Sequence, residues 1–306
     1  MPDLSDTKVR FILNPRAGSG KYLEKLIRWI HMTFSETGIK HDIQITQKRR
    51  DGMKLAQEAI REGYLHIVAA GGDGTINEVG NALVHTEAIL GIIPIGSGNG
   101  LARALKIPLD WKKACQLLFN GRVHKIDTGK LSSGSHTRYF FATAGMGFEA
   151  YLGCLYDKNA TSRRGIWPYF FLALREFHKF QPPEIMLEFT TPVGQKKIIG
   201  NPLIITIANT EQFGGGAIIA PGALPDDGVL NLCIIYKLGF LQALYHAPKL
   251  FTGNITRVPQ MMMYPITSLN ITRKSSTPVQ VDGEPVMCGP EVSVTVLPGA
   301  LKVFTC

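Results

Sequence analysis

Residues 67–79 read IVAAGGDGTINEV, and this stretch decides the fold class of the chain. The apolar run 67–70 has the length and flanks of a buried parallel strand, and it ends abruptly in Gly71-Gly72-Asp73-Gly74. Three glycines in four positions allow positive φ angles and a close approach of the backbone to a ligand. Thr75-Ile76-Asn77-Glu78 has the form of a capping box, so we expect a helix to begin where the glycines end.

A strand, a glycine turn and a helix N-terminus together form an anion site, through oriented backbone amides and the positive end of the helix dipole. Asp73 does not suit a simple phosphate site, because a carboxylate repels phosphate unless a divalent cation lies between them or the carboxylate handles a proton. A tight turn without chemical function is the alternative, since Asp-Gly is a common turn dipeptide.

Two further strands end in glycine-containing turns. Strand 9–13 leads into 14–21, NPRAGSGK, where Asn14 and Lys21 can donate to phosphate. This turn is not a Walker A motif, because that motif requires Ser or Thr after the lysine and the chain has Tyr22. Strand 90–95 leads into Gly96-Ser97-Gly98-Asn99-Gly100 and a helical turn.

Strands and helices alternate over the first hundred residues, which predicts an α/β domain with an open, mostly parallel sheet. Ligands of such sheets bind beyond the carboxyl ends of the strands, where all three glycine turns fall. The only dinucleotide-like match, 145–150, lacks the acidic residue expected further on, so we interpret it as a decoy. The remaining expected elements are a strand at 41–46 and helices at 21–36 and 51–62.

From about Lys125 the pattern changes to short β-type runs with turn signals, which predicts an antiparallel sandwich or barrel. Helical inserts are expected at 166–180, which is rich in aromatic residues, and at 239–252. An aromatic stripe is more often core than binding surface, although lipid tails need such a surface. The predicted strands are 125–131, 137–144, 184–190, 198–207, 229–236, 268–272, 292–297 and 301–305.

Composition limits the function classes. A length of 306 residues with 45% hydrophobic and 19% charged residues predicts a globular protein of two domains. The net charge of +9 indicates an anionic partner, and the short basic clusters without interleaved aromatics favour a nucleotide or an anionic membrane over nucleic acid. Five cysteines without a CxxC pair, no signal peptide and no apolar window of eighteen residues predict a cytoplasmic protein.

Two acidic stretches lie in the second half. Residues 224–229, LPDDGV, offer carboxylates and turned carbonyls of the kind that hold Mg²⁺ or Ca²⁺. Asp282-Gly283-Glu284 places two carboxylates around a glycine between two β-runs. Each stretch alone is as consistent with a solvated turn as with a site.

Taken together, these motifs resemble the bacterial diacylglycerol kinase and sphingosine kinase superfamily of soluble lipid kinases. They occur in the family's order over almost the whole chain, although the element GGDGT alone is shared with NAD kinases and phosphofructokinases. The Gly96-Ser97-Gly98-Asn99 form is closer to the sphingosine and ceramide kinases than to many bacterial diacylglycerol kinases, which leaves the lipid open. The matching segments are Asn14-Pro15, 71–78, 96–103, 126–129, 213–216 with 220–221, 226–228 and 282–284.

The resemblance implies an NAD-kinase-like or phosphofructokinase-like nucleotide-binding domain over 1–127, to which 299–306 return, and a lipid-binding β-sandwich over 128–298, with the active site in the cleft between them. It implies that Asp127 lies at the lipid head group and that a structural Mg²⁺ binds Asp227 and the carbonyls of Leu224 and Val229. ATP would bind residues of the three glycine turns, which are Asn14, Lys21, Gly71, Gly72, Gly74, Thr75, Gly96, Ser97, Gly98 and Asn99.

The sequence therefore predicts an ATP- and Mg²⁺-dependent kinase that phosphorylates a lipid hydroxyl at an anionic membrane surface, peripheral to the inner membrane face. Asp73 or Asp282 is the expected proton acceptor, and Glu284 is the better candidate for a metal ligand at the catalytic centre. The alternatives are an NAD kinase-like enzyme with a soluble substrate and a non-catalytic nucleotide or lipid sensor. Arg163 and Arg164 are expected to face the membrane, and a homodimer is left open.

Overall fold

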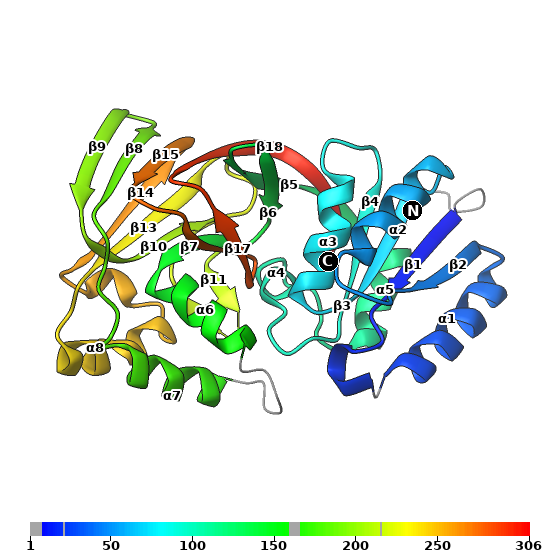
Figure 1. Ribbon diagram of the computed structural model, residues 1–306. Helices are drawn as coiled ribbons and strands as arrows, with labels where there is room; N and C mark the ends of the chain where they lie inside the picture. Colours follow the sequence, from blue (N-terminus) through cyan, green and yellow to red (C-terminus); the bar gives the residue numbers. More distant parts are fainter. Residues whose placement is uncertain (1–7, 21, 159–165, 215) are drawn as a thin grey trace. The chain divides into compact units, whose positions relative to one another are not determined.

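The computed structural model describes residues 8–20, 22–158, 166–214 and 216–306. The chain divides into two compact units, which Figure 1 shows coloured along the sequence. Unit 1 consists of the residues up to Ile126 together with Gly299–Cys306, and unit 2 consists of Asp127–Pro298.

Unit 1 is an α/β domain with a parallel sheet in the order β2-β1-β3-β4-β18. Every second residue of a strand faces the same side, so Phe11 and Leu13 of β1 meet Leu26, Ile30 and Phe34 of the first helix in one apolar cluster. The strands are β1 (Lys8–Leu13), β2 (Lys40–Ile45), β3 (His66–Gly71), β4 (Ile89–Pro94) and the C-terminal part of β18 (Glu291–Thr305).

The helices of unit 1 follow the strands in alternation, as the sequence predicts. A positive-φ glycine, Gly38 at φ 71°, ends the first helix in the manner of an αL cap. The helix after Asp110 was not predicted, although Asp110 is its N-cap and accepts a hydrogen bond from the N–H of Lys113. The helices are α1 (Leu23–Thr37), α2 (Asp51–Arg61), α3 (Asp73–Leu83), α4 (Gly100–Ala104) and α5 (Trp111–Asn120).

Unit 2 is an antiparallel β-sandwich. One of its sheets has the order β14-β13-β10-β7-β16-β17, and the other contains β15, β8, β9 and the N-terminal part of β18. Side chains from both sheets form one buried cluster, which includes Met146, Ile205 and Leu232 from the first sheet and Leu187 and Leu269 from the second. The fold class expected from the sequence, an α/β domain followed by an antiparallel sandwich, is confirmed.

Several predicted strand boundaries in unit 2 were wrong. The run 137–144 is two strands, and 198–207 is also two, because Asn201 separates them. The runs 292–297 and 301–305 are one strand, β18, which continues through Pro298 and Gly299 although Gly299 has φ 57°. The strands of unit 2 and its border are β5 (Arg122–Ser133), β6 (His136–Phe140), β7 (Thr143–Gly147), β8 (Ile185–Thr191), β9 (Gly194–Gly200), β10 (Pro202–Ala208), β11 (Gln212–Gly214), β12 (Ala217–Ile218), β13 (Leu230–Tyr236), β14 (Met261–Ile266), β15 (Ser268–Arg273), β16 (Thr277–Val281) and β17 (Glu284–Cys288).

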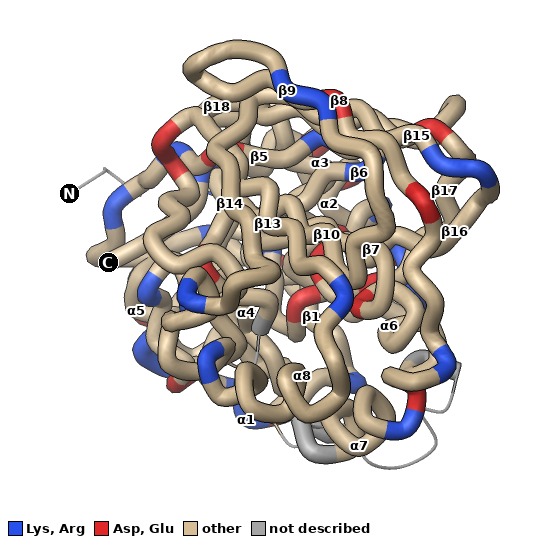
Figure 2. The backbone as a smooth tube through the Cα atoms, turned by 90° about the vertical axis from the view of Figure 1, so that its left-hand side faces the viewer, with Lys and Arg blue, Asp and Glu red and all other residues tan. Residues whose placement is uncertain are grey.

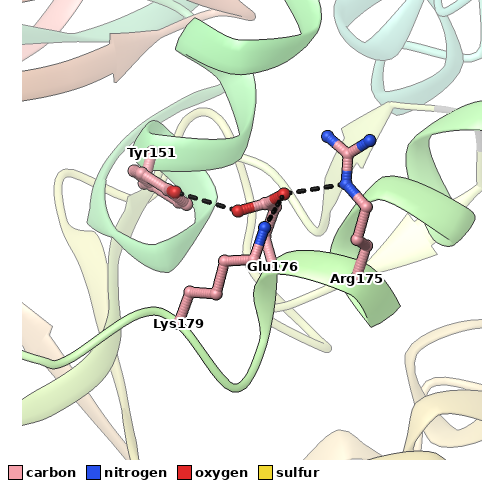
Figure 3. Close-up of polar contacts among 4 residues, drawn as sticks. All are labelled: Tyr151, Arg175, Glu176 and Lys179. Carbon is pink, nitrogen blue, oxygen red and sulfur yellow. Dashed lines mark hydrogen bonds and ion pairs between the residues drawn. The ribbon is translucent and has the colours of Figure 1, made fainter.

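Among the described residues of unit 2 there are three α-helices, α6 (Phe148–Lys158), α7 (Ile166–Glu176) and α8 (Phe240–His246). The two inserts predicted from sequence correspond to α7 and α8, whereas α6 was missed. Glu176 at the end of α7 joins the first two of these helices, as Figure 3 shows. Its carboxylate accepts hydrogen bonds from Tyr151 Oη of α6 at 3.1 Å, from Arg175 Nε at 2.8 Å and from Lys179 Nζ at 3.1 Å. No helix among the described residues is long and apolar enough to span a membrane.

Candidate functional site

Three turns meet at the carboxyl ends of β1, β3 and β4 in unit 1. The N–H of Asn14 donates to the carbonyl of Ala70 at 2.9 Å, and its side-chain amide donates to Thr75 Oγ1 at 2.9 Å. The N–H of Ile95 donates to the carbonyl of Gly71 at 3.0 Å. The turns that the sequence predicted separately are therefore bonded into one cluster, as expected for neighbouring strands of a parallel sheet.

The glycines of this cluster serve close packing. A Cβ atom at Gly96 would lie 2.4 Å from Gly72 Cα, and one at Gly71 would lie 2.5 Å from Thr75 Cβ. The glycines at 71–74 do not use the positive φ angles that glycine allows: Gly72 has φ −93°, and the left-handed residue of the third turn is Asn99 at φ 55°. Glycine is required here because two backbone turns pass each other without room for a side chain.

The predicted capping box at 75–78 was also wrong. Helix α3 begins at Asp73 with Gly72 as its N-cap, three residues earlier than the Thr75 cap implied. Glu78 instead accepts hydrogen bonds from the N–H groups of Arg50 at 2.7 Å and Gly52 at 3.0 Å, at the start of α2. A side chain from one helix therefore satisfies the N-terminal donors of another, a tertiary contact that a local motif cannot reveal.

Asp73 connects the second turn to the third. Its carboxylate accepts hydrogen bonds from the N–H of Asn99 at 2.9 Å and the N–H of Gly100 at 2.6 Å. Burial raises the pKa of Asp73, and these two N–H groups and the charge of Arg103 partly oppose that shift. Gly98 permits the contact, because a Cβ there would lie 2.5 Å from Asp73 Oδ2.

A cavity of about 360 Å³ opens beside the third turn of unit 1. Of the predicted nucleotide-binding residues, Gly96, Ser97 and Asn99 line it. Sequence reasoning missed the other side of this cavity, which Arg103, Trp111 and Tyr22 help to form. Arg103 could have been found, because it is a basic residue in the first turn after the glycines, and its Nε donates to the carbonyl of Gly98 at 3.1 Å.

Not every predicted nucleotide-binding residue joins this arrangement. Gly74 lies inside α3, and the cavity lining does not include the residues of the first two turns. Lys21, Arg163 and Arg164 lie outside the described residues.

In unit 2, Asp127 is 2% exposed and secures the acidic turn 225–228. Its N–H donates to the carbonyl of Pro225 at 2.6 Å, and its Oδ2 accepts from the N–H of Gly228 at 2.6 Å. The neighbouring Asp227 accepts from the N–H of Val229 at 3.1 Å. Burial raises the pKa of Asp227, and the charges of Asp127 and Asp226 raise it further.

The acidic turn suits a cation. Asn209, whose side-chain amide donates to the carbonyl of Asp127 at 2.9 Å, has a buried Oδ1 without a hydrogen-bond partner among the described residues. Oxygen atoms that lack donors, near carboxylates that repel each other, are what a hard cation such as Mg²⁺ would bind. The described residues contain no cluster of three or more His, Cys, Asp or Glu side chains that could hold a metal, so carbonyl oxygens, such as those predicted at Leu224 and Val229, would have to contribute.

Asp282 and Gly283 form the two-residue turn between β16 and β17, with φ angles of 44° and 89°. Positive φ at both positions is characteristic of the type I′ hairpin turn, for which Asp-Gly is a preferred sequence. The Asp282 carboxylate accepts from the N–H groups of Phe141 at 2.9 Å, Ala142 at 2.9 Å and Thr143 at 3.0 Å. Glu284 opens β17 and is half-buried. Both candidate bases, Asp73 and Asp282, are thus fixed in place by backbone donors.

Comparison with known proteins agrees with this arrangement. Residues 8–131 match the Diacylglycerol kinase catalytic domain, and residues 142–305 match the YegS C-terminal NAD kinase beta sandwich-like domain. The chain belongs to the diacylglycerol kinase family that these two domains define. This membership identifies the protein as a lipid kinase, as the motifs predicted.

The similarity to each relative covers almost the whole length of both chains. A "Diacylglycerol kinase" of Staphylococcus carnosus is 26% identical over 279 residues, which cover 90% of this chain and 88% of that protein. A "Probable lipid kinase YegS" of Escherichia fergusonii is 29% identical over 295 residues, covering 95% and 93%. The crystal structure of a putative diacylglycerol kinase from Bacillus anthracis superposes with a TM-score of 0.75 at 22% identity, covering 98% of this chain and 97% of that one, which shows the shared fold.

Proposed function

We propose that this lipid kinase transfers the γ-phosphate of ATP to the free hydroxyl of a lipid such as diacylglycerol or a sphingoid base. The observation that carries the proposal is the bonded cluster of three strand-end turns, in which Asn14 contacts Thr75 and Asp73 contacts Asn99. Phosphoryl transfer needs little covalent chemistry from the protein but demands positioning and stabilisation of negative charge. Rigid turns with donor groups at the carboxyl edge of a parallel sheet suit that requirement.

In this proposal unit 1 is the nucleotide-binding domain, predicted over 1–127 with 299–306. The cavity beside Ser97 would accept ATP, with Arg103 offering positive charge and Trp111 an aromatic surface. The other predicted ATP-binding residues of the three glycine turns, such as Asn14 and Thr75, are still proposed to bind ATP, because they hold the turns together. Lys21 remains the predicted donor to phosphate from the first turn.

Mg²⁺ would have two roles. The structural ion would be held by Asp227 with the carbonyls of Leu224 and Val229, and Asp127 and Asn209 would complete the oxygen surroundings. When bound at the reacting centre, where Glu284 is the proposed ligand, Mg²⁺ would supply positive charge that offsets the charge of the phosphates.

The acceptor lipid is proposed to bind in unit 2, the lipid-binding domain predicted over 128–298. Asp282 or Asp73 would accept the hydroxyl proton. Asp127 remains the predicted head-group residue, in addition to its bonds to the acidic turn. Beside α6 and α7 lies an apolar cluster suited to lipid chains, formed by Phe148, Leu152 and Leu203 with Tyr169, Leu172, Phe177 and Phe180.

Peripheral membrane association is proposed through α7 and α8. The turn that follows α7 contacts the start of α8, because the rings of His178 and Phe240 lie 4.7 Å apart. Several large apolar side chains are exposed on these two helices, since Phe171 is 65%, Leu241 78% and Tyr245 74% exposed, and such a group marks an interaction surface. Figure 2 shows basic segments around α7, where Arg175 and Lys179 have side chains that are 64% and 61% exposed. Aromatic and basic side chains together favour an anionic bilayer surface.

A panel of acceptors tests the proposed reaction. The purified protein would be incubated with labelled ATP and Mg²⁺ together with diacylglycerol, ceramide or a sphingoid base in mixed micelles, or with NAD. We expect label in at least one lipid and none in NAD. Label in NAD alone would favour the soluble-substrate kinase, and ATP binding without transfer to any acceptor would favour a sensor.

Sedimentation with liposomes tests the membrane surface separately. Binding should rise with anionic lipid content, fall with salt, and decrease in the double variant Phe171→Ser/Leu241→Ser. Val193→Ser is the matched control, because Val193 is 89% exposed in the turn between β8 and β9. Equal loss in the control, or binding that is independent of salt and lipid charge, would contradict the assignment.

A further inference from the structure

The carboxyl group of Glu149, in the first turn of α6, packs against Gly145 of β7. A Cβ at Gly145 would lie only 1.1 Å from Glu149 Oε1, so the glycine provides the space that the carboxyl occupies. On the neighbouring strand β10, the hydroxyl of Thr206 donates to Glu149 Oε2 at 3.0 Å. Gly145 and Thr206 are paired in register, and both face away from the sandwich core because their neighbours Met146 and Ile205 face into it.

The second oxygen of this carboxyl is unused. Glu149 Oε1 is buried and has no hydrogen-bond partner among the described residues. Burial raises the pKa of Glu149 to about 8, so the carboxyl is protonated at neutral pH. Since Oε2 accepts from Thr206, the proton belongs on Oε1, which makes Oε1 a buried donor without an acceptor. A buried donor without an acceptor destabilises the folded protein unless something binds it.

The described residues that neighbour Glu149 carry no charge that would stabilise its ionised form. The titratable groups that face it are the phenol of Tyr169 on α7, whose hydroxyl reaches the Glu149 carbonyl at 3.5 Å, and the thiol of Cys233 on β13. Burial and the charge of Glu149 raise the pKa of both groups, so both are neutral. Among the described residues, these neighbours therefore provide no cation for an ionised Glu149.

Glu149 belongs to a row of polar groups on this sheet face. Gln280 of β16 is paired with Gly145, which is paired with Thr206, and Gln280 Oε1 is also buried without a partner among the described residues. A second row of polar groups lies two residues further along these strands, on the same face. There the N–H of Thr143 donates to the Asp282 carboxylate, and Thr143 Oγ1 is buried without a hydrogen-bond partner among the described residues. Rows two residues apart are separated by about 7 Å.

We propose that Glu149 determines acceptor specificity: its carboxyl group donates a hydrogen bond to the ester carbonyl oxygen of an acyl-bearing lipid whose free hydroxyl lies at Asp282. This inference rests on the proposed function. A glycerol hydroxyl and a neighbouring ester carbonyl are a few bonds apart, and with a hydrogen bond at each end they span about the 7 Å between the two rows. The apolar cluster formed by Phe148, Leu152 and Leu203 adjoins this row and would surround the acyl chains.

The decisive comparison uses two acceptors that differ only in the carbonyl. Phosphorylation of a 1,2-diacylglycerol and of the matching dialkyl ether would be measured with ATP and Mg²⁺ in mixed micelles. Wild type should prefer the ester by about tenfold in kcat/KM, which corresponds to about 1.4 kcal/mol, within the range of one hydrogen bond. Glu149→Leu should lose this preference, whereas Glu149→Gln should keep most of it, because the amide can donate in place of the carboxyl proton.

Two further variants keep the result interpretable. Thr206→Val removes the hydroxyl that orients the carboxyl and should reduce the preference even if Glu149→Leu fails to fold. Glu188→Gln, a surface residue of β8 with a 47% exposed side chain, should leave the preference unchanged.

The outcomes separate the two proposals. Phosphorylation of no lipid would reject the proposed function and this inference with it. Equal use of ester and ether by wild type, or an unchanged preference in Glu149→Leu, would reject the inference alone. Loss of activity in Glu149→Gln together with preferential use of a sphingoid base by wild type would also overturn it, because an ionised Glu149 would then bind an amine.

Discussion

The turn cluster of unit 1 and the polar row of unit 2 satisfy their polar groups in opposite ways. In unit 1, Asp73 receives two backbone hydrogen bonds and Asn99 bonds the backbone of Gly96 at both its side-chain atoms. In unit 2, buried oxygens of Glu149, Gln280 and Thr143 have no partner among the described residues. The first region is assembled before any ligand arrives, whereas the second has hydrogen-bonding capacity that a ligand would use.

This difference suits the two substrates of a kinase. A phosphate group is small and highly charged and is best met by fixed donors that need no rearrangement. A lipid acceptor is mostly apolar, so a few buried polar groups in apolar surroundings can select it. The following predictions test whether the two regions differ in this way.

The largest effect should follow from removing either candidate base. Asp73→Asn and Asp282→Asn should each lower kcat by about 10²–10³-fold, because proton acceptance by a positioned carboxylate contributes on that scale. Melting curves would verify that each variant folds, and Glu36→Gln on the exposed surface of α1 would serve as the control. Retained activity in both variants would reject the mechanism, and loss in only one would identify the base.

Replacing Gly96 or Gly145 by alanine should lower the stability by different amounts, because Gly96 packs against backbone and Gly145 packs against a side chain. Gly96→Ala should destabilise the protein by about 2–3 kcal/mol, because the new Cβ meets Gly72 Cα, which cannot move aside. Gly145→Ala should cost less, because it meets the Glu149 carboxyl, and combining it with Glu149→Ala should restore stability. Urea unfolding would measure the free energy of unfolding of wild type, Gly96→Ala, Gly145→Ala and the double variant. Absence of rescue in the double variant would contradict the placement of Glu149.

The pH dependence of stability should reflect Glu149. Its pKa is about 8 in the folded protein against 4.5 ordinarily, so between these values the folded state holds a proton that the unfolded chain releases. Stability should therefore fall by about 1.4 kcal/mol per pH unit as the pH rises through this window, and then level off above it. Glu149→Gln removes this contribution. Its melting temperature relative to wild type should rise between pH 6 and pH 8, and a constant difference would refute the prediction.

The smallest effect concerns the acidic turn. Added Mg²⁺ should raise the melting temperature of wild type by a few degrees, as expected for a ligand that binds only the folded state. Asp227→Ala should melt at a lower temperature than wild type, carry less metal and show no such rise. An equal response to Mg²⁺ in both proteins, with no divalent ion at this turn in purified wild type, would contradict the structural metal site.

The sequence by itself determined the class of fold and the turn cluster of unit 1. Apolar runs that end in glycine are local signals, and parallel strands necessarily bring their carboxyl ends to one edge, so Asn14, Asp73 and Asn99 could be grouped without coordinates. Even the hairpin turn at Asp282-Gly283 is a local signal.

Only the tertiary structure decided the contacts between residues far apart in the chain. Glu78 has the position of a local helix cap, but it accepts hydrogen bonds from backbone N–H groups at the start of α2. Glu149 lies in the segment 145–150, which from the sequence alone is interpreted as a chance match to a dinucleotide-binding motif. Its partners Gly145, Thr206 and Gln280 come from three strands. The pairing register of antiparallel strands depends on the packing of the whole sandwich, and a shift by one residue would turn each of these side chains to the other face.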